Sequence, residues 1–370
     1  MTVNPTAAPE ILVVGGGIAA LELVLALRDL AGDRVHVTIV APEPDFVLRP
    51  MLVAEPLGRG AAHRRPLSKI ASDLGCRLVP AAVASVDPAR RRVALHSGDT
   101  LPYDTLVLAP GARMIPAFDG VISLGDAEGA EALAEMRDEM RRGVVRSVAF
   151  VAPTTTGWLL PLYEAALLTA SGDPVRVSLV TPEQRPLELF GAEASATVAR
   201  ALDAAGIEFI SAKQADVSAG TVWLPGHARG SLSADRIVSL PLARGPRLPG
   251  VPAAGLYGLI PVDLYGRVDG LPDAYAVGDA TDFPLKQGGI ACQQADVVAA
   301  NVAARHGVDV TPTPFQPVLR ATLLTGDGPP IALGVPTEGV HPTKLPGRFL
   351  APYLQSHAEL RNADRTAGVR

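Results

Sequence analysis

Apolar residues in the amino-terminal part of the chain follow a pattern typical of a strand, a turn, a helix and a second strand. Residues 11–14 form a short β-branched run that predicts a strand, and residues 34–40 predict the next one. Between them, the apolar residues of 18–30 recur at helical spacing, and only three of these positions carry polar side chains. The pattern therefore predicts a largely buried helix packed on a sheet.

The middle of the chain repeats this plan. Residues 145–152 predict a strand, residues 159–170 a helix and residues 175–180 another strand. Residues 192–210 then predict an amphipathic helix followed by a further strand. The repetition indicates two α/β units of the same design.

The carboxyl-terminal part predicts another strand and helix, followed by a separate extension. Residues 274–277 predict a short buried strand, and a helix follows over 289–304. Residues 315–335 suggest two more strands, and residues 345–360 a final helix. The apolar residues of this final helix share one face, which we expect to cap the protein's own core. Membrane docking or a homodimer stays open as an alternative. That face carries Phe349, Leu350, Tyr353, Leu354, His357 and Leu360.

Composition and charge narrow the class of protein. Of the 370 residues, 48% are hydrophobic and 19% charged, which is typical of a globular chain. The net charge of −5 gives no electrostatic basis for binding nucleic acid. No apolar run approaches the ~20 residues of a membrane span, and the first residues lack the pattern of a signal peptide. We therefore expect a cytoplasmic protein.

The two cysteines suggest no special chemistry. Cys76 and Cys292 form neither a C-x-x-C pair nor a metal-binding spacing. Each is explained as a small buried apolar side chain, and reduced thiols fit a cytoplasmic location. We expect no metal site.

The turn after the first strand has the sequence GGGIAA, residues 15–20. Gly15 permits a tight turn, Gly17 lets a pyrophosphate approach the backbone, and Ala20 allows helix and strand to pack closely. The amino end of the helix then presents free N–H groups to the phosphates. In its strand–turn–helix–strand context, this spacing predicts a dinucleotide site.

An acidic residue usually ends the second strand of such a unit and binds ribose hydroxyls. The expected position is occupied by Ala41, and the nearest acid is Glu43. Glu43 is therefore the candidate ribose ligand, although a solvated turn glutamate explains it nearly as well.

A second signature follows the strand at 274–277. Gly278 and Asp279 end that strand, and a helix begins near Gly289. An aspartate in this position can accept hydrogen bonds from a polyol chain, and a helix amino end can stabilise negative charge on a reduced isoalloxazine ring. Residues 103–112 supply a further strand and a glycine turn directed to the same region.

Together, the turn at 15–20, the stretch 103–112 and the sequence AVGDATDFPLKQGG resemble the pyridine nucleotide–disulfide oxidoreductase superfamily of flavoproteins. Within it, the chain is most similar to type II NADH dehydrogenases and sulfide:quinone oxidoreductases. The resemblance implies an α/β fold with two Rossmann-like domains, the second inserted in the first, and a short C-terminal cap. It implies an FAD-binding domain of residues 1–115 and 245–310, a second, NAD(P)-binding-like domain of residues 116–244, and a cap of residues 311–370.

The resemblance also implies that FAD is bound non-covalently. The pyrophosphate would lie at the first glycine turn, the adenine against the backbone around Val83, and the ribityl chain at Asp279. Pro110 and Gly111 match a superfamily turn that has threonine in place of this proline, so one hydroxyl contact is missing. The implied cofactor-binding residues are Gly15, Gly17, Ala20, Glu43, Arg49, Val83, Pro110, Gly111, Gly278, Asp279, Gln287, Gly288 and Gly289.

Catalytic side chains are not identified by these motifs. Lys286 adjoins the residues that approach the flavin ring in the superfamily, which makes it a weak catalytic candidate. A solvated loop lysine explains it about equally well.

In the superfamily the second domain binds NAD(P)H, but here its phosphate turn is altered. The glycines are replaced by Pro153, Thr154, Thr155 and Thr156, and only Gly157 remains, shifted in position. Proline has no N–H to donate, and β-branched threonine resists positive φ. Thr181 stands where an acid would hold the ribose of NAD. Ordinary NAD(P)H binding is therefore not expected, although an unusual phosphate pose on the threonine hydroxyls stays an alternative.

These features predict an FAD-dependent oxidoreductase that passes electrons from a small donor through FAD to a quinone-like or protein acceptor. Sulfide oxidation by two thiols is not expected, because the altered turn has no cysteine and Cys292 falls inside a helix. An NAD(P)H:acceptor reductase with an atypical site is one alternative. A non-catalytic flavin-binding redox sensor or partner subunit is the other.

Overall fold

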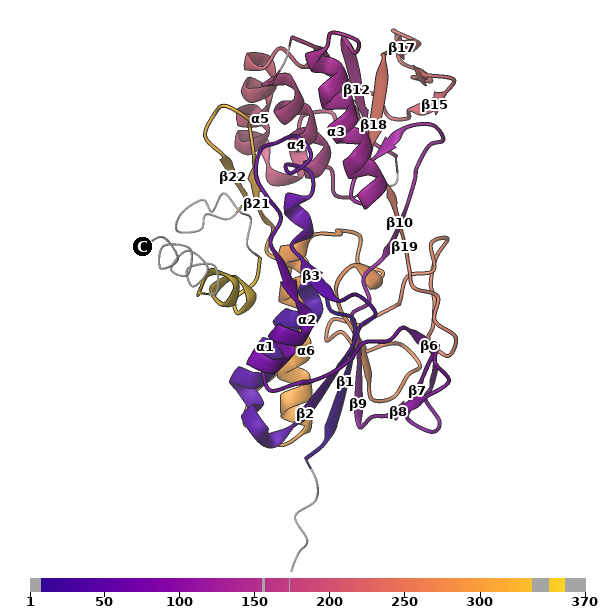
Figure 1. Cartoon of the computed structure of the whole chain (residues 1–370), viewed down its shortest axis with the longest axis vertical. Helices are drawn as coiled ribbons and strands as arrows, with labels where there is room; N and C mark the ends of the chain where they lie inside the picture. The colour runs from indigo at the N-terminus through magenta and orange to yellow at the C-terminus, as the bar shows by residue number, and fades with distance from the viewer. Residues whose placement is uncertain (1–7, 155–156, 173, 335–345, 357–370) are drawn as a thin grey trace, which may run out of the picture.

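The computed structural model describes residues 8–154, 157–172, 174–334 and 346–356. The chain forms two α/β halves stacked along the long axis of the molecule, as Figure 1 shows. Each half contains one five-stranded sheet with helices packed against it.

The first half is built on a parallel sheet with strand order β20-β9-β1-β2-β5. The apolar run at 11–14 lies in the central strand and is wholly buried, as expected for a parallel strand covered on both faces. α1 and α6 lie side by side against the sheet (Figure 1). These elements are β1 (Glu10–Val14), α1 (Ile18–Ala31), β2 (His36–Val40), β5 (Arg77–Val79), β9 (Thr105–Leu108), β20 (Ala274–Ala276) and α6 (Gly288–Arg305).

The second half repeats the design with strand order β11-β18-β12-β13-β14, again with every pair parallel. α4 is buried over nearly its whole length, which explains why its sequence is apolar on all sides. The elements are β11 (Ile122–Ser123), α3 (Ala127–Arg141), β12 (Ser147–Val151), α4 (Leu160–Ala170), β13 (Arg176–Thr181), α5 (Ala192–Ala204), β14 (Glu208–Ser211) and β18 (Arg236–Ser239).

The second half is inserted in the first. The first sheet takes four strands from the chain before residue 109 and its fifth, β20, from residues 274–276, whereas the second sheet uses residues 122–239. β10 (Arg113–Ile115) and β19 (Leu242–Arg244) pair antiparallel and carry the chain out and back between the halves (Figure 1). The predicted fold class is therefore confirmed, while the predicted domain boundaries stay predictions.

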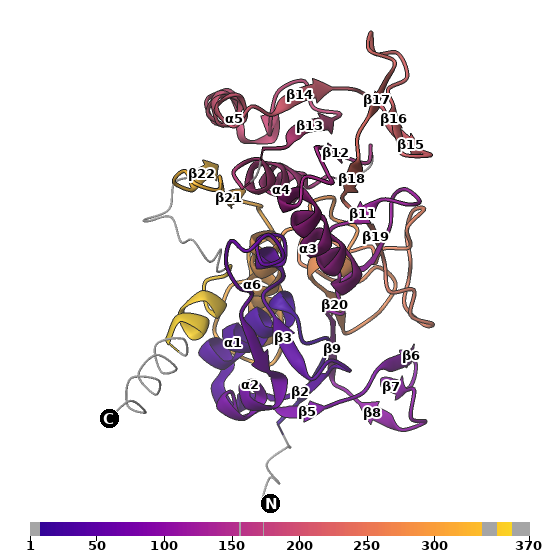
Figure 2. The ribbon, with the colours of Figure 1, turned by 45° about the horizontal axis from the view of Figure 1, so that its top comes forward.

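Smaller elements that the hydrophobic pattern did not predict decorate both halves. Figure 2 shows one three-stranded meander at the outer edge of each half. A short hairpin and a two-turn helix lie next to the first sheet. These elements are β3 (Asp45–Val47), β4 (Arg64–Pro66), α2 (Leu67–Asp73), β6 (Val83–Asp87), β7 (Arg92–Leu95), β8 (Thr100–Pro102), β15 (Asp216–Ser218), β16 (Thr221–Trp223) and β17 (Ser231–Ser233).

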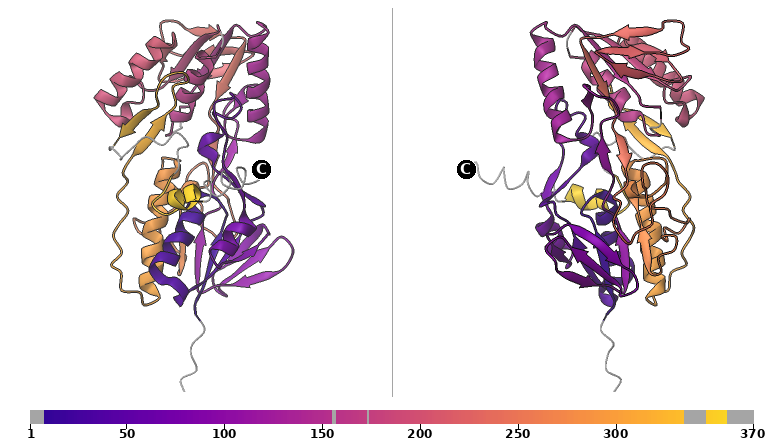
Figure 3. Two further views of the ribbon diagram at one scale, coloured as in Figure 1. Left: turned by 60° about the vertical axis from the view of Figure 1, so that its left-hand side comes forward. Right: turned by 90° about the vertical axis from the view of Figure 1, so that its right-hand side faces the viewer.

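The C-terminal extension packs on both halves. Figure 3 shows the chain running from the end of α6 along the molecule to the hairpin of β21 (Arg320–Leu323) and β22 (Ile331–Gly334). This hairpin packs in the core of the second half, whereas the helix at 350–356 buries Leu350 and Leu354 in the core of the first half. Of the residues predicted to share its face, His357 and Leu360 lie outside the described residues.

Three further expectations concern membranes, metals and thiols. Within the described part of the chain, no helix is both long enough and apolar enough to span a membrane. The same residues contain no group of three or more His, Cys, Asp or Glu side chains that could hold a metal ion. Cys76 and Cys292 are both free thiols, the first half-buried and the second buried.

Candidate cofactor and substrate cleft

The sheet registers make the two turns directly comparable. Val14 pairs with Val40 in the first half, and Val151 pairs with Val180 in the second. The residue after each first strand continues the ladder, since the Gly15 N–H donates to Val40 at 2.8 Å and the corresponding Ala152 N–H donates to Val180 at 2.9 Å. Gly15, Gly16 and Gly17 therefore correspond in position to Ala152, Pro153 and Thr154.

The first turn has the geometry of a phosphate-binding turn. Gly15 has a φ of +118°, and a Cβ on it would lie 2.1 Å from the carbonyl oxygen of Ala109, so only glycine fits there. Gly17 precedes α1 in an extended conformation, and among the described residues no atom lies within 4 Å of the place of its Cβ. The turn therefore packs tightly against the protein at Gly15, and at Gly17 it leaves its backbone open to an approaching ligand.

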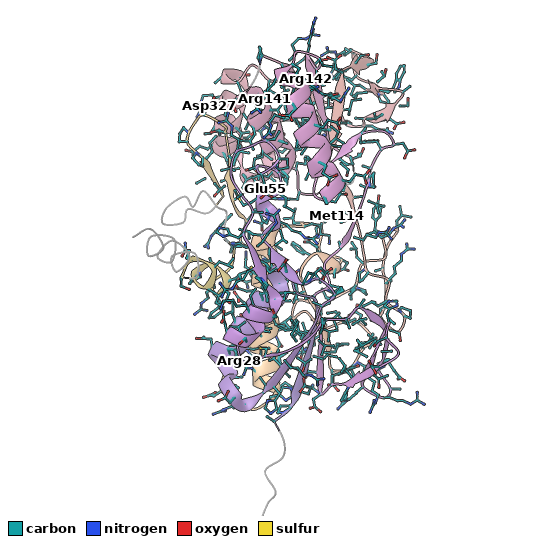
Figure 4. The ribbon with its side chains drawn as sticks, viewed as in Figure 1. Arg28, Glu55, Met114, Arg141, Arg142 and Asp327 are labelled. Atoms are coloured by element: carbon teal, nitrogen blue, oxygen red, sulfur yellow. The ribbon has the colours of Figure 1, made fainter. Side chains whose placement is uncertain are left out.

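A cleft of about 1980 Å³ begins at this turn and continues between the two halves. Figure 4 labels Glu55 and Met114, which line it. Except for Ala20, every residue predicted to bind the cofactor lines this cleft: Gly15, Gly17, Glu43, Arg49, Val83, Pro110, Gly111, Gly278, Asp279, Gln287, Gly288 and Gly289.

Ala20, whose predicted role is to let helix and strand pack closely, is wholly buried in α1 and does not line the cleft. The close approach in this region occurs one residue earlier, where a Cβ on Gly278 would lie 3.0 Å from the Cβ of Ala19. Gly278 has a φ of +74°, and the side chain of Gln294 accepts its N–H at 2.7 Å. Small residues on both sides therefore hold the turn at Asp279 against the start of α1.

Asp279 and Lys286 provide opposite charges in the cleft. Burial raises the pKa of Asp279, while the positive charges of Lys286 and Arg49 act in the opposite direction. Burial lowers the pKa of Lys286, whose ammonium group donates to the carbonyl oxygens of Thr281 at 2.6 Å and Phe283 at 2.7 Å. Lys286 therefore fixes the loop after Asp279, and its catalytic role stays a prediction.

The amino end of α6 opens into the cleft. The side-chain oxygen of Gln287 caps the helix by accepting the N–H of Ile290 at 2.7 Å, and its amide nitrogen donates to the carbonyl of Arg320 at 3.0 Å. Gly288 and Gly289 begin the helix and line the cleft. Their backbone and the helix dipole give this end of the cleft a partial positive charge.

The second turn is not built like the first. α1 begins at Ile18, four residues after Val14, whereas α4 begins at Leu160, nine residues after Val151. The connection is thus five residues longer, and it contains Thr155 and Thr156, which lie outside the described residues. Gly157 is pressed against the first half, since a Cβ there would lie 2.7 Å from the carbonyl oxygen of Pro284.

An acidic residue occurs at the same position after both second strands. Glu43 follows Val40 by three residues, and Glu183 follows Val180 by three, each directly after a proline. Glu43 is exposed at the cleft, whereas Glu183 accepts a hydrogen bond of 2.5 Å from the hydroxyl of Tyr163. Burial raises the pKa of Glu183 and of Tyr163. The acid of the second half is therefore paired with a side chain of its own domain.

Sequence reasoning missed several polar residues beside the cleft. Glu22 is wholly buried within α1, and Asp296 and Arg348 line the cleft next to it. The only signal for Glu22 was a glutamate in an otherwise apolar stretch. Asp296 and Arg348 come close to Glu22 only because the C-terminal part of the chain folds back onto the first half. Hydrophobic periodicity gives no information about such a contact.

The fold and the cleft define a dinucleotide-binding flavoprotein oxidoreductase. Residues 9–307 match the family described as pyridine nucleotide-disulphide oxidoreductase. The chain therefore belongs to this family, as its motifs predicted, and members of the family bind FAD.

Two relatives illustrate the likeness in sequence. An NADH dehydrogenase-like protein of Mycobacterium tuberculosis is 30% identical over 294 residues, which cover 73% of this chain and 72% of the relative. A nitric oxide reductase FlRd-NAD(+) reductase of Aeromonas salmonicida is 28% identical over 354 residues, covering 92% of this chain and 84% of the relative.

Two solved structures share the fold. The sulfide:quinone oxidoreductase of Aquifex aeolicus superposes with a TM-score of 0.76 at 21% identity, covering 86% of this chain and 82% of that one. NDH2 of Plasmodium falciparum in complex with NADH gives a TM-score of 0.72 at 14% identity, covering 95% and 94%. At these identities the likeness supports the fold alone.

Proposed function

We propose that the protein binds FAD in the cleft without a covalent bond and passes electrons from a small donor other than NAD(P)H to a quinone-like or protein acceptor. The observation that carries the proposal is the contrast between the two turns. The first is open at Gly17 and has an exposed acid, Glu43, that lines the cleft. The second has Pro153 and Thr154 in the corresponding places, and its acid is bound to Tyr163.

The chain's residues fit FAD in the first half. The open backbone at Gly17 and the amino end of α1 would receive the pyrophosphate, and Glu43 the adenosine ribose. Asp279 would accept hydrogen bonds from the ribityl hydroxyls, and the Gln287-capped end of α6 would stabilise negative charge near the ring. Bound FAD would supply two-electron chemistry.

An apolar part of the cleft supports a flat apolar acceptor. Beyond the glycine turn, the cleft runs between α3, α4 and the β21–β22 hairpin, where apolar side chains predominate. Pockets of this kind bury aromatic ligands well. The apolar residues there are Val53, Leu124, Ala127, Leu160, Pro161, Ala321, Ala332 and Leu333.

The test is anaerobic stopped-flow mixing of the purified flavoprotein with NADH or NADPH, monitored by flavin absorbance. We expect slow bleaching or none with either nucleotide, and rapid bleaching with dithionite as the positive control. Fast, saturable bleaching by either nucleotide would overturn the choice of donor and leave the flavin assignment intact.

The second candidate is an NAD(P)H:acceptor reductase with an atypical nucleotide site. It is favoured by relatives whose names specify NADH dehydrogenase-like and NAD(+) reductase proteins. In that case the N–H groups at the start of α4, displaced by the longer connection, would have to receive the phosphates in a new position. The same stopped-flow experiment separates the two candidates.

A further inference from the structure

Two buried glutamates occupy corresponding places in the two halves. Glu22 is the fifth residue of α1, and Glu164 is the fifth residue of α4. Their exposed fractions are 0% and 1%. A carboxylate is costly to bury unless hydrogen-bond donors surround it, so the partners of these side chains indicate what they do.

Glu22 holds the start of the C-terminal helix. Its carboxylate accepts three backbone N–H groups: Arg348 at 2.6 Å, Phe349 at 3.0 Å and Leu350 at 2.6 Å. We name residues 346–350 the strap. Hydrogen bonds from backbone donors to a charged acceptor are among the stronger ones, so Glu22 fixes the strap to α1.

The strap lies at the dinucleotide end of the cleft. Pro346, Gly347 and Arg348 line it together with the starts of α1 and α6. A Cβ on Gly288 would lie 3.2 Å from Ile18 and 3.7 Å from Pro346, so the strap adjoins both helix ends that face the predicted phosphates. Moving the strap would uncover this end of the cleft.

Glu164 holds the hairpin at the other end. Its carboxylate oxygen Oε1 accepts the N–H of Leu324, directly after β21, at 2.9 Å. Arg59 adds an ion pair of 2.9 Å to Asp327 in the hairpin loop, which Figure 4 labels. The hairpin lines the apolar part of the cleft with Ala321, Thr322, Ala332 and Leu333.

We propose that Glu22 and Glu164 are duplicated positioning residues that hold the C-terminal extension as one wall of the cleft, Glu22 at the FAD end and Glu164 at the acceptor end. The proposal rests on the proposed function in one respect, namely that this cleft holds FAD and an acceptor. The two parts of the C-terminal extension then have different roles: the strap retains the cofactor, and the hairpin shapes the acceptor site.

The experiment compares matched variants at both positions. Glu22→Leu and Glu164→Leu remove the acceptor oxygens, and Glu22→Gln and Glu164→Gln return one oxygen each. Gly347→Ala and Asp327→Asn loosen the strap and the hairpin while both glutamates stay in the chain. In Gly347→Ala the new Cβ would lie 2.4 Å from the Glu22 carboxylate, so the strap must move even if Glu22→Leu fails to fold.

Two readouts separate the ends of the cleft. The first is the rate of FAD release, followed by flavin fluorescence after dilution. The second is reoxidation of dithionite-reduced enzyme by menadione, which gives the menadione concentration for half-maximal rate and needs no physiological donor. Hydrogen exchange at 324 and 348–350 reports directly on the two attachments.

Strap variants should speed FAD release by about tenfold or more and leave the half-maximal menadione concentration unchanged. Hairpin variants should raise that concentration by a similar factor without releasing FAD. Partial recovery by the Gln variants would support the role of the carboxylate oxygens. Folded variants in which both ends respond alike, or in which hydrogen exchange stays at the wild-type level, would overturn the proposal.

Failure of the proposed function can be told apart from failure of the two attachments. If NADH reduced the flavin rapidly, release and reoxidation would still test the two attachments. If the purified protein bound no FAD, hydrogen exchange alone would decide whether Glu22 and Glu164 hold the strap and the hairpin.

Discussion

The two βαβ units of this chain share a sheet register and differ in the turn after each first strand. In the first, three glycines lead directly into α1; in the second, proline and threonine lead into a connection five residues longer. The strands, helices and pairing of the second unit are intact. A Rossmann-like framework is therefore maintained by core packing, independently of the turn that gives it a phosphate site.

The acids after the second strands differ in the same way. Glu43 and Glu183 occupy equivalent places. Glu43 lines the cleft, whereas Glu183 accepts a hydrogen bond from the hydroxyl of Tyr163 in α4. The aromatic ring of Tyr163 is wholly buried and stacks against Phe209. The hydroxyl of Tyr163 thus takes up the hydrogen-bonding capacity of a carboxylate, Glu183, that in an open site would bind a ribose.

Replacing Gly15 with alanine should have the largest effect. The added Cβ would overlap the carbonyl of Ala109, and the φ of +118° is strained for any side chain, by about 1–3 kcal/mol before the overlap is counted. We expect protein that purifies without flavin, measured by its absorbance spectrum. Gly32→Ala is the control, because Gly32 also has a positive φ but borders open space. Equal flavin content in both variants would contradict this reading of the first turn.

Gly17→Ala should have the next largest effect, and on the cofactor alone. The position of the new Cβ is clear of other described atoms, so the apoprotein should fold with an unchanged melting temperature. Where the backbone must approach a pyrophosphate, the same methyl group should weaken FAD binding roughly 100-fold. Titration calorimetry of the apoprotein measures this. Unweakened binding would place the pyrophosphate away from Gly17.

Local patterns predicted much of this fold because its strands and helices alternate in chain order. The β-branched run of β1 and the apolar periodicity of α1 and α4 are local features, and so is the glycine spacing of the first turn. Both parallel sheets then follow from the right-handed crossovers that such alternation requires.

The remaining features depend on contacts between distant segments. Glu22 meets residues 348–350 across more than three hundred positions, and Tyr163 meets Glu183 only because α4 packs against β13. Asp45 and Arg64 fall in an antiparallel pair whose strands have only three residues each, too few for a period-2 pattern to give a strand signal. The role of a buried polar side chain is set by its partners, which a single sequence does not reveal.

FAD retention should depend on pH through Asp296, a smaller effect. Asp296 shares a hydrogen bond with Glu22, and burial together with that neighbouring charge raises its pKa to about 7 from the ordinary 3.8, with Arg348 acting in the opposite direction. Burial also raises the pKa of Glu22 and of the adjacent Cys292. In the folded chain, Asp296 therefore binds a proton more tightly than in solution.

The sign follows from linkage: a raised carboxyl pKa stabilises the folded packing of Asp296 against Glu22, which holds the strap, fully below pH 3.8, and this contribution is lost as pH rises to about 7. FAD release should accordingly quicken roughly three- to tenfold between about pH 5 and pH 8. Fluorescence-detected release measures this. Asp296→Asn keeps a neutral donor beside Glu22 and should flatten the profile; an unchanged profile in that variant would remove Asp296 from the explanation.

Tyr163→Phe should have the smallest effect on the cofactor, and it sharpens the comparison most. Loss of the hydroxyl leaves Glu183 without that donor and should cost about 1–3 kcal/mol of stability in urea denaturation. Tyr353→Phe, which removes a more exposed bond of 2.9 Å to Asp73, should cost less. We expect calorimetry to detect no ADP-ribose binding to Tyr163→Phe, because Pro153 still lacks the N–H and the longer connection still displaces α4. Binding in this variant alone would mean that the internal tyrosine, and not the altered turn, closes the second site.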